Sequence, residues 1–194
     1  MVNAEFVPGK TALVFIDPYN DFLSEGGKLL PIFIAPHHRA APGEFDGWDH
    51  PTPYQLGASQ MQVFAKGSWG GEWHPDFAPQ PGDIVVKEHW GGSSFANTDL
   101  DLLLKQKGVT RLIIIGLIAN TCVETTARFA ADLGYHVTLV RDATAAFSME
   151  AMHAAHEINA PNFVHALVTT AELLDAFRNP SSASVQGAIY VRHS

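Results

Sequence analysis

The sequence predicts an α/β fold of three layers, in which a mostly parallel, doubly wound sheet of six strands is covered by helices on both faces. Two observations support this prediction. Short apolar runs rich in Val, Ile and Leu recur along the chain, and continuous apolar runs suit strands that are buried on both faces. From residue 84 onward these runs alternate with segments of helical spacing, which is the pattern of repeated βαβ units.

Each expected element is marked by its own run or spacing. Leu100, Leu103 and Leu104 recur at helical intervals, and Gly108 stands where that helix is expected to stop. We expect strands at residues 11–16, 32–35, 84–86, 112–115, 136–140 and 163–168. We expect helices at residues 98–106, 123–133, 149–158 and 170–177.

Length and charge restrict the classes of protein that fit. A chain of 194 residues suits a single domain, here residues 1–194, with one core. Twenty acidic residues against 12 basic ones give a formal net charge of -8, and no run of Lys and Arg is present. Such a chain lacks the cluster of positive charges that binds the phosphate backbone of a nucleic acid. We therefore expect a small-molecule substrate and no nucleic-acid partner.

The amino terminus and the cysteine count indicate where the protein works. Residues 1–5 lack the basic start and apolar core of a secretory signal, and no stretch reaches the roughly 18 apolar residues of a membrane span. With one cysteine, no intrachain disulfide can form. We expect a cytoplasmic protein with no membrane partner.

Three stretches carry no regular period. Residues 43–82 are dense in Pro, Gly and Trp, and we interpret them as an irregular wall or lid over a site. Residues 179–194 form a tail that includes a short apolar run suited to an edge strand or a partner subunit. Residues 18–31 lack the helix that a parallel crossover usually contains. One interpretation is that part of the natural chain is missing near residues 23–32.

Three chemically capable side chains follow expected strands. Asp17, Lys87 and Cys122 each fall at or just beyond the carboxyl end of a strand, the edge at which open α/β sheets bind ligands. A thiol at a helix start is favoured as a thiolate and neighbours backbone N–H groups that can hold an oxyanion. Each residue alone also fits a structural role, as a turn cap, a solvated charge or a small apolar filler. Their coincidence predicts an active site.

The same residues carry a family resemblance. The sequences ALVFID at 12–17, VVK at 85–87 with Ser94 and Phe95 after it, and IGLIANTCV at 115–123 resemble the isochorismatase-like cysteine hydrolases. That family includes nicotinamidases, N-carbamoylsarcosine amidases and ureidoacrylate amidases. The match spans roughly residues 10–175, in the order and spacing typical of the family.

The resemblance implies a parallel sheet of strand order 3-2-1-4-5-6. It further implies Cys122 as nucleophile, Asp17 as proton shuttle and Lys87 as the positive neighbour. A cis peptide between Leu117 and Ile118 would turn the Ile118 N–H toward the Cys122 N–H to hold an oxyanion. A homodimer or homotetramer is implied as well.

Metal binding and substrate contact are separate questions. Residues 35–39 read APHHR where related nicotinamidases carry a metal-binding Asp-x-His, and no Cys or His pair has zinc-site spacing. We therefore expect neither a metal nor another cofactor. Aromatic side chains are the candidate substrate contacts, although core packing explains an aromatic equally well. The candidates are Phe22, Trp73, Trp90 and Phe95.

The predicted function is hydrolysis of a carbon–nitrogen bond in an amide, ureide or N-carbamoyl compound through a thioester. Family members that cleave isochorismate tend to lack the cysteine, so its presence favours this reading. Two alternatives stay open. One is an isochorismatase-type hydrolase of an ester or vinyl ether that forms no covalent intermediate. The other is a non-catalytic small-molecule-binding protein on the same fold, in which Cys122 only packs.

Overall fold

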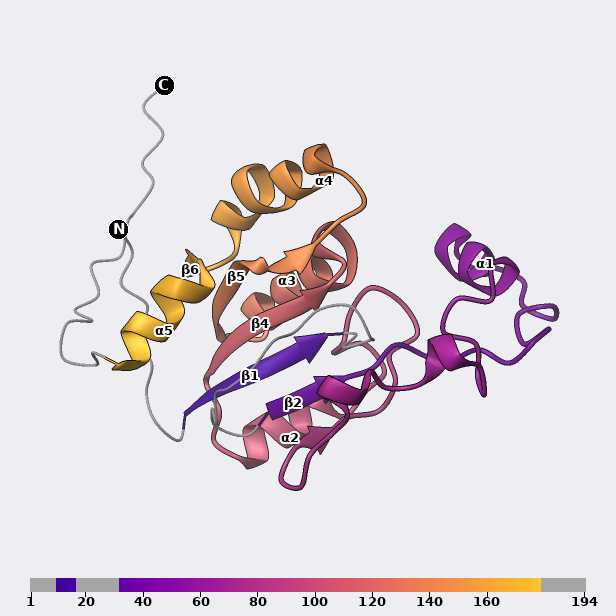
Figure 1. Ribbon diagram of the computed structural model, residues 1–194, viewed down its shortest axis with the longest axis horizontal. Helices are drawn as coiled ribbons and strands as arrows, with labels where there is room; N and C mark the ends of the chain where they lie inside the picture. The colour runs from indigo at the N-terminus through magenta and orange to yellow at the C-terminus, as the bar shows by residue number, and fades with distance from the viewer. Residues whose placement is uncertain (1–9, 17–31, 179–194) are drawn as a thin grey trace.

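The computed structural model describes residues 10–16 and 32–178. Six parallel strands in these residues form one sheet with the order β3-β2-β1-β4-β5-β6, which confirms the predicted fold class and strand order (Figure 1). The strands are β1 (Thr11–Ile16), β2 (Ile32–Ala35), β3 (Ile84–Val85), β4 (Arg111–Leu117), β5 (His136–Ala145) and β6 (Ala166–Val168).

Helices of three kinds connect the strands. The α-helices are α1 (Pro53–Gln60), α2 (Leu100–Gln106), α3 (Glu124–Asp132), α4 (Met149–His153) and α5 (Thr170–Arg178). Two π-helical segments, η3 (Ala119–Val123) and η4 (Ala154–Asn159), run directly into or out of α-helices. Short 3-10 turns occur at η1 (Trp69–Gly71), η2 (Pro75–Phe77) and η5 (Ala160–Asn162).

The two faces of the sheet bury two separate apolar clusters. Along β4, Leu112 and Ile114 belong to the larger cluster, which also holds side chains of α2 and α3. The intervening Ile113 and Ile115 belong to a second cluster with Leu173 of α5. Successive side chains of a strand point to opposite faces, so a run of four apolar residues is what a strand covered on both faces requires. This alternation produces the three layers.

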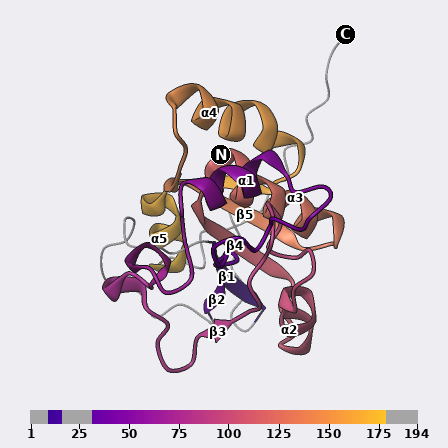
Figure 2. The same cartoon turned by 90° about the vertical axis from the view of Figure 1, so that its right-hand side faces the viewer.

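The segment that carries α1 lies beyond the carboxyl ends of the strands. In Figure 1 the arrow of β1 points toward α1, and Figure 2, viewed from that side, shows α1 in front of the sheet. The segment also reaches the face covered by α5, because Phe77 of η2 packs against the second cluster. Residues 43–82 thus form a wall at the edge of the sheet where parallel folds bind ligands.

Helix α1 corrects the expectation that residues 43–82 are irregular throughout. It begins with a capping box, in which Thr52 and Gln55 each use a side chain to bond the other's backbone N–H, and Pro53 occupies the first turn. Most of its residues are exposed or half-buried. A helix without an apolar face carries no 3.6-residue period, so only its cap marks it in the sequence.

Other boundaries differ by a few residues. Strand β3 ends at Val85 and β6 begins only at Ala166, three residues later than expected. The expected helix at 149–158 is present, but its second half is π-helical. Strands β1 and β2 are parallel neighbours. The connection between them, residues 17–31, lies outside the described residues and holds all but the last residue of the 23–32 stretch. The tail at 179–194 lies outside the described residues as well. No described helix is long and apolar enough to cross a membrane.

Candidate active site

Cys122 lies where β4 passes into a helix at the carboxyl edge of the sheet. The π-helical turn η3 contains it and continues without a break into α3. Its side chain is 1% exposed and belongs to the main apolar cluster. The Thr121 hydroxyl lies 3.9 Å from the sulfur. The thiol therefore stands in the first turn of a helix, where the helix dipole favours a negative charge.

The turn before Cys122 contains a cis peptide bond between Leu117 and Ile118, at the position that the family resemblance implies. The carbonyl oxygen of Ile118 accepts hydrogen bonds from the backbone N–H groups of Thr121, at 3.0 Å, and Val123, at 3.2 Å. The main chain on both sides of Cys122 is thus tied to one carbonyl. This fixes the path of the turn that presents the cysteine.

Gly116 brings β1 against this turn. It pairs with Ile16 in the parallel register, and its φ of 114° is one that side chains rarely adopt. A Cβ on Gly116 would overlap the backbone of Ile16. The glycine therefore allows the last described residue of β1, which precedes Asp17 in the chain, to lie beside the strand that leads to Cys122.

The predicted site residues differ in where they lie. Asp17 and Phe22 are outside the described residues. Lys87 follows β3 at the edge of the sheet, and its side chain is exposed. Its backbone N–H donates to Asp99 Oδ1 at 2.8 Å, which ties the end of β3 to the start of α2. The exposed lysine thus contrasts with the buried sulfur of Cys122.

The candidate substrate-binding aromatics fall in two environments. Trp73 and Trp90 are half-buried on the wall side of the sheet edge. Phe95 is 6% exposed and packs in the core, with its ring 6.1 Å from Phe129 and 5.9 Å from Tyr135. Its described contacts are those of a core residue.

The loop that follows Trp90 is bonded to the helix after Cys122. Thr126 of α3, which is fully buried, accepts the backbone N–H of Ser94 at 3.0 Å. The Thr126 hydroxyl also donates to Ser94 Oγ at 3.1 Å. A Cβ on Gly92 would lie 3.3 Å from Thr125 Cβ, so this loop and α3 are in close contact. The carboxyl ends of β3 and β4 are joined through these contacts.

Histidines at the ends of β2 and β3 form a cluster whose arrangement was not predicted from the sequence. His37 and His89 form an isolated parallel bridge, and their rings lie 5.0 Å apart. His89 is fully buried, with Nδ1 at 2.6 Å from the Gly91 carbonyl oxygen. The sequence signal was available, since two adjacent histidines follow one apolar run and a third follows another.

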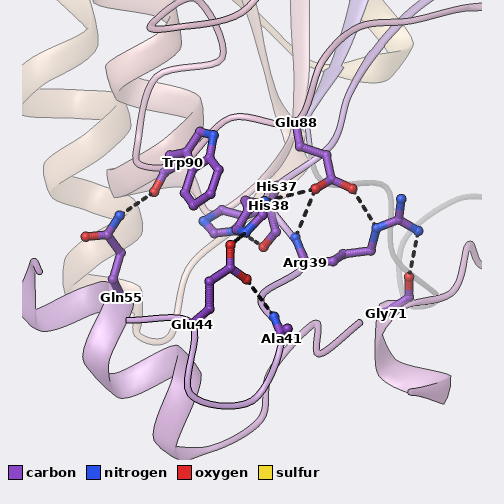
Figure 3. Close-up of polar contacts among 9 residues, drawn as sticks. All are labelled: His37, His38, Arg39, Ala41, Glu44, Gln55, Gly71, Glu88 and Trp90. Carbon is purple, nitrogen blue, oxygen red and sulfur yellow. Dashed lines mark hydrogen bonds and ion pairs between the residues drawn. The ribbon is translucent and has the colours of Figure 1, made fainter. Parts of the chain in front are cut away.

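His38 lies between two carboxylates (Figure 3). Its Nε2 is 2.9 Å from Glu44 Oε1 and its Nδ1 is 3.1 Å from Glu88 Oε2. The Ala41 backbone N–H lowers the pKa of Glu44. Burial opposes ionisation of Glu88, but hydrogen bonds from the side chain and backbone of Arg39 outweigh it and lower the pKa of that carboxyl as well.

Within residues 10–16 and 32–178, no group of three or more His, Cys, Asp or Glu side chains is placed to hold a metal ion. The cluster around His38 is held instead by hydrogen bonds and ion pairs among its own members.

Comparisons with known proteins agree with this geometry. The family model described as the isochorismatase domain matches residues 11–172. The ureidoacrylate amidohydrolase RutB of Enterobacter sp. (strain 638) is 36% identical over 127 residues, which cover 65% of this chain and 54% of that protein. RutB of Pantoea ananatis is 31% identical over 178 residues, which cover 72% of this chain and 70% of that protein.

Solved structures share the architecture. A cysteine hydrolase from Pseudomonas syringae pv. phaseolicola 1448A superposes with a TM-score of 0.74 at 25% identity and covers 94% of this chain and 98% of its own. The N-carbamoylsarcosine amidase from Thermoplasma acidophilum shares the fold, with a TM-score of 0.56 at 24% identity, covering 82% and 95% of the two chains.

A parallel sheet of this strand order, with a cysteine at the helix start after its fourth strand, defines an open, doubly wound α/β protein with a thiol at the edge where such sheets bind ligands. The chain belongs to the isochorismatase family, within the group of isochorismatase-like cysteine hydrolases. It spans about half the length of most of the curated relatives that it matches.

Proposed function

We propose that this chain hydrolyses a carbon–nitrogen bond, other than a peptide bond, in a small amide, ureide or N-carbamoyl compound. The observation that carries the proposal is the position of Cys122 in the first helical turn after β4. The similarity to ureidoacrylate amidohydrolases supports the bond type.

The proposed reaction begins with transfer of the Cys122 thiol proton to Asp17. The thiolate then adds to the substrate carbonyl carbon, and the backbone N–H groups of Ile118 and Cys122 stabilise the oxyanion. The tetrahedral intermediate collapses to a thioester, and ammonia or an amine leaves with the proton from Asp17. Water attacks the thioester, Asp17 takes its proton, and the carboxylic or carbamic acid and the free thiol are released.

The pairing of β1 with β4 supports the role of Asp17. Ile16 lies opposite Gly116, six residues before Cys122, and Asp17 follows Ile16 directly. Consecutive Cα atoms lie about 3.8 Å apart across a trans peptide, so we propose that Asp17, as the residue after Ile16, supplies its carboxylate at the sheet edge that carries the thiol. A carboxylate near a thiol supplies the proton acceptor that nucleophilic attack requires.

Lys87 is proposed as the positive charge that favours the thiolate. Its position after β3 places it at the same sheet edge. Because its side chain is exposed and Cys122 is buried, this role requires the ammonium group to reach toward the thiol when substrate binds. Trp73 and Trp90 are proposed substrate contacts, and Phe22 is proposed with them.

The burial of Cys122 favours one other candidate, a non-catalytic binding protein in which the cysteine only packs. Thiol labelling at neutral pH separates the two. An activated thiolate reacts faster than the same cysteine in a denatured control, whereas a packed thiol reacts more slowly than that control.

The site is proposed to work in the cytoplasm, where a single catalytic thiol stays reduced, and in a homodimer or homotetramer. Phe147 and Met149, 93% and 79% exposed, lie two positions apart in the chain, just before α4 and at its first residue, and are suited to a subunit contact. Size-exclusion chromatography with light scattering measures the assembly directly.

An ammonia-release screen over amides, ureides and N-carbamoyl compounds tests the activity. The comparison is wild type against Cys122→Ala, with urea unfolding to verify that the variant remains folded. Release by wild type that is lost in the folded variant supports the proposal. Equal release by both proteins rejects Cys122 as nucleophile.

A further inference from the structure

His38 has a carboxylate at each of its two ring nitrogens. Nε2 is 2.9 Å from Glu44 Oε1, and Nδ1 is 3.1 Å from Glu88 Oε2 (Figure 3). The side chain is 15% exposed. Its ring stacks on Trp90 at a centroid distance of 3.6 Å and an interplanar angle of 18°.

The two carboxylates have no proton to give to this ring. Glu88 accepts Arg39 Nε at 2.7 Å and the Arg39 backbone N–H at 3.2 Å. Glu44 accepts the Ala41 N–H at 2.7 Å. These contacts favour the ionised carboxylates, which only accept hydrogen bonds. A neutral imidazole carries one N–H group and can donate to one of these carboxylates, whereas the imidazolium carries two and can donate to both.

Other charged and titratable groups complete the surroundings of His38. Arg39, the next residue in the chain, adds a positive charge, and the charge of Lys66, a residue of the wall, acts on Glu44. His37 Nδ1 lies 2.9 Å from the His38 carbonyl oxygen, and the His38 backbone N–H donates to the His89 carbonyl at 2.9 Å. The two carboxylates are the groups that contact the ring nitrogens, and stacking on an indole further favours a cationic ring.

The contacts of His38 join the wall to the sheet edge. Glu44 belongs to the wall, whereas Glu88 and Trp90 follow β3. The Trp90 ring stacks on His38 and also on Trp48, whose ring centroid is 5.5 Å away. The Trp90 carbonyl oxygen accepts Gln55 Nε2 of α1 at 2.9 Å. The His38 ring thus stands at the centre of the contacts that hold residues 43–60 against the end of β3.

We propose that His38 is a positioning residue that acts as an imidazolium between Glu44 and Glu88. In that form it holds the wall of residues 43–82 against the end of β3. Loss of its proton weakens this contact and releases the wall. Without the proton, one ring nitrogen presents a lone pair to a carboxylate, and that contact becomes repulsive. Only the effect of His38 on substrate binding rests on the proposed function. The contact between the wall and the end of β3 is measured without substrate.

The first test is the protonation state of His38 in the wild-type chain. Two-bond ¹H–¹⁵N spectra, assigned with His38→Gln, distinguish an imidazolium from either neutral tautomer. The proposal requires two protonated ring nitrogens at pH 7. One unprotonated nitrogen at that pH overturns it.

The second test is hydrogen exchange of wall amides, corrected for the intrinsic effect of pH. Suitable reporters are Leu56, Met61 and Lys66, whose N–H groups donate to Thr52, Gly57 and Ala40. We expect His38→Gln to reduce their protection at pH 7 by at least about tenfold, and wild type to lose the same protection as His38 deprotonates. Amides of β4 serve as the internal reference.

His50→Gln is the matched control, since His50 is an exposed histidine of the same wall, and it should leave protection unchanged. Unchanged protection in His38→Gln, or an equal loss in His50→Gln, overturns the proposal. If the amidase activity exists, His38→Gln should raise KM more than it lowers kcat, and the pH at which wild-type KM rises should match the titration of His38. Absence of amidase activity would reject the proposed function, but the hydrogen-exchange measurements would still test the role of His38 in holding the wall.

Discussion

Gly116 and Ile16 face each other across β4 and β1, and their backbones approach so closely that a Cβ on Gly116 would overlap the Ile16 carbonyl group. The contact has a consequence for the site, because Ile16 precedes Asp17 and Gly116 leads into the turn that carries Cys122. The architecture therefore depends on a glycine that does no chemistry.

Gly116→Ala should destabilise the fold by more than about 3 kcal/mol, since the alanine meets both a backbone overlap and an unfavourable φ. Urea unfolding measures the loss. Gly134→Ala is the matched control, because Gly134 also has a positive φ of 90° but has open space around its Cβ position. Equal losses in the two variants would show that φ alone, and not the approach to Ile16, makes Gly116 necessary.

Thr126→Val should cost about 1–3 kcal/mol of unfolding free energy, because it leaves the buried Ser94 N–H without its acceptor. Thr126→Ser retains the hydroxyl and should lose clearly less. Urea unfolding of both variants separates the hydrogen bond from the loss of packing. A serine variant as unstable as the valine variant would contradict the assignment.

His136 should make the fold less stable in mild acid. Burial first, then the charges of His165 and Arg111, lower the pKa of His136 to about 4. The unfolded chain binds this proton near pH 6.5 and the folded chain only near pH 4, so the stabilising contribution is present above pH 6.5 and is lost as pH falls toward 4.

The test for His136 compares unfolding free energies from pH 7 to 4. His136→Gln removes the titrating ring and should reduce the loss of stability over this interval. His153→Gln, at an exposed position on α4, leaves the His136 environment intact and should keep the wild-type slope. A His136→Gln slope that equals that of wild type would contradict the prediction.

Lys87→Met tests the proposed positive neighbour of Cys122. If the ammonium group favours the thiolate, its loss should lower kcat/KM at pH 7 by at least about tenfold and move the thiolate limb of the pH profile upward. Lys107→Met removes another exposed lysine, at the end of α2, and should change neither. Matching profiles for the two variants would remove Lys87 from the mechanism.

The sheet was predictable because its strands are buried on both faces. The apolar runs at β1 and β2 have the observed bounds, since Val, Ile, Leu, Phe and Ala side chains fill both sides of these strands. Strand β4 extends one residue before and two beyond its predicted range, to include Arg111, Gly116 and Leu117. Pairing with β1 and β5, rather than side-chain hydropathy, sets those ends.

The wall was not predictable in the same way. Helix α1 has no apolar face, so only the spacing of Thr52, Pro53 and Gln55 indicates it. The contacts of His38 join residues up to 50 positions apart, and no local pattern encodes them. Sequence reasoning located Cys122 from its strand and helix start, whereas the exposure of Lys87 depends on how the end of β3 lies at the sheet edge.

The proposed mechanism requires a covalent bond between Cys122 and the substrate carbonyl carbon. It is tested most directly by acid-quenching the enzyme during turnover of a substrate found in the ammonia screen and mapping its peptides by mass spectrometry. We predict that the Cys122 peptide gains the mass of the acyl group and that Cys122→Ala gains none. An unmodified Cys122 during continuing ammonia release, with turnover preserved in Cys122→Ala, would contradict the account.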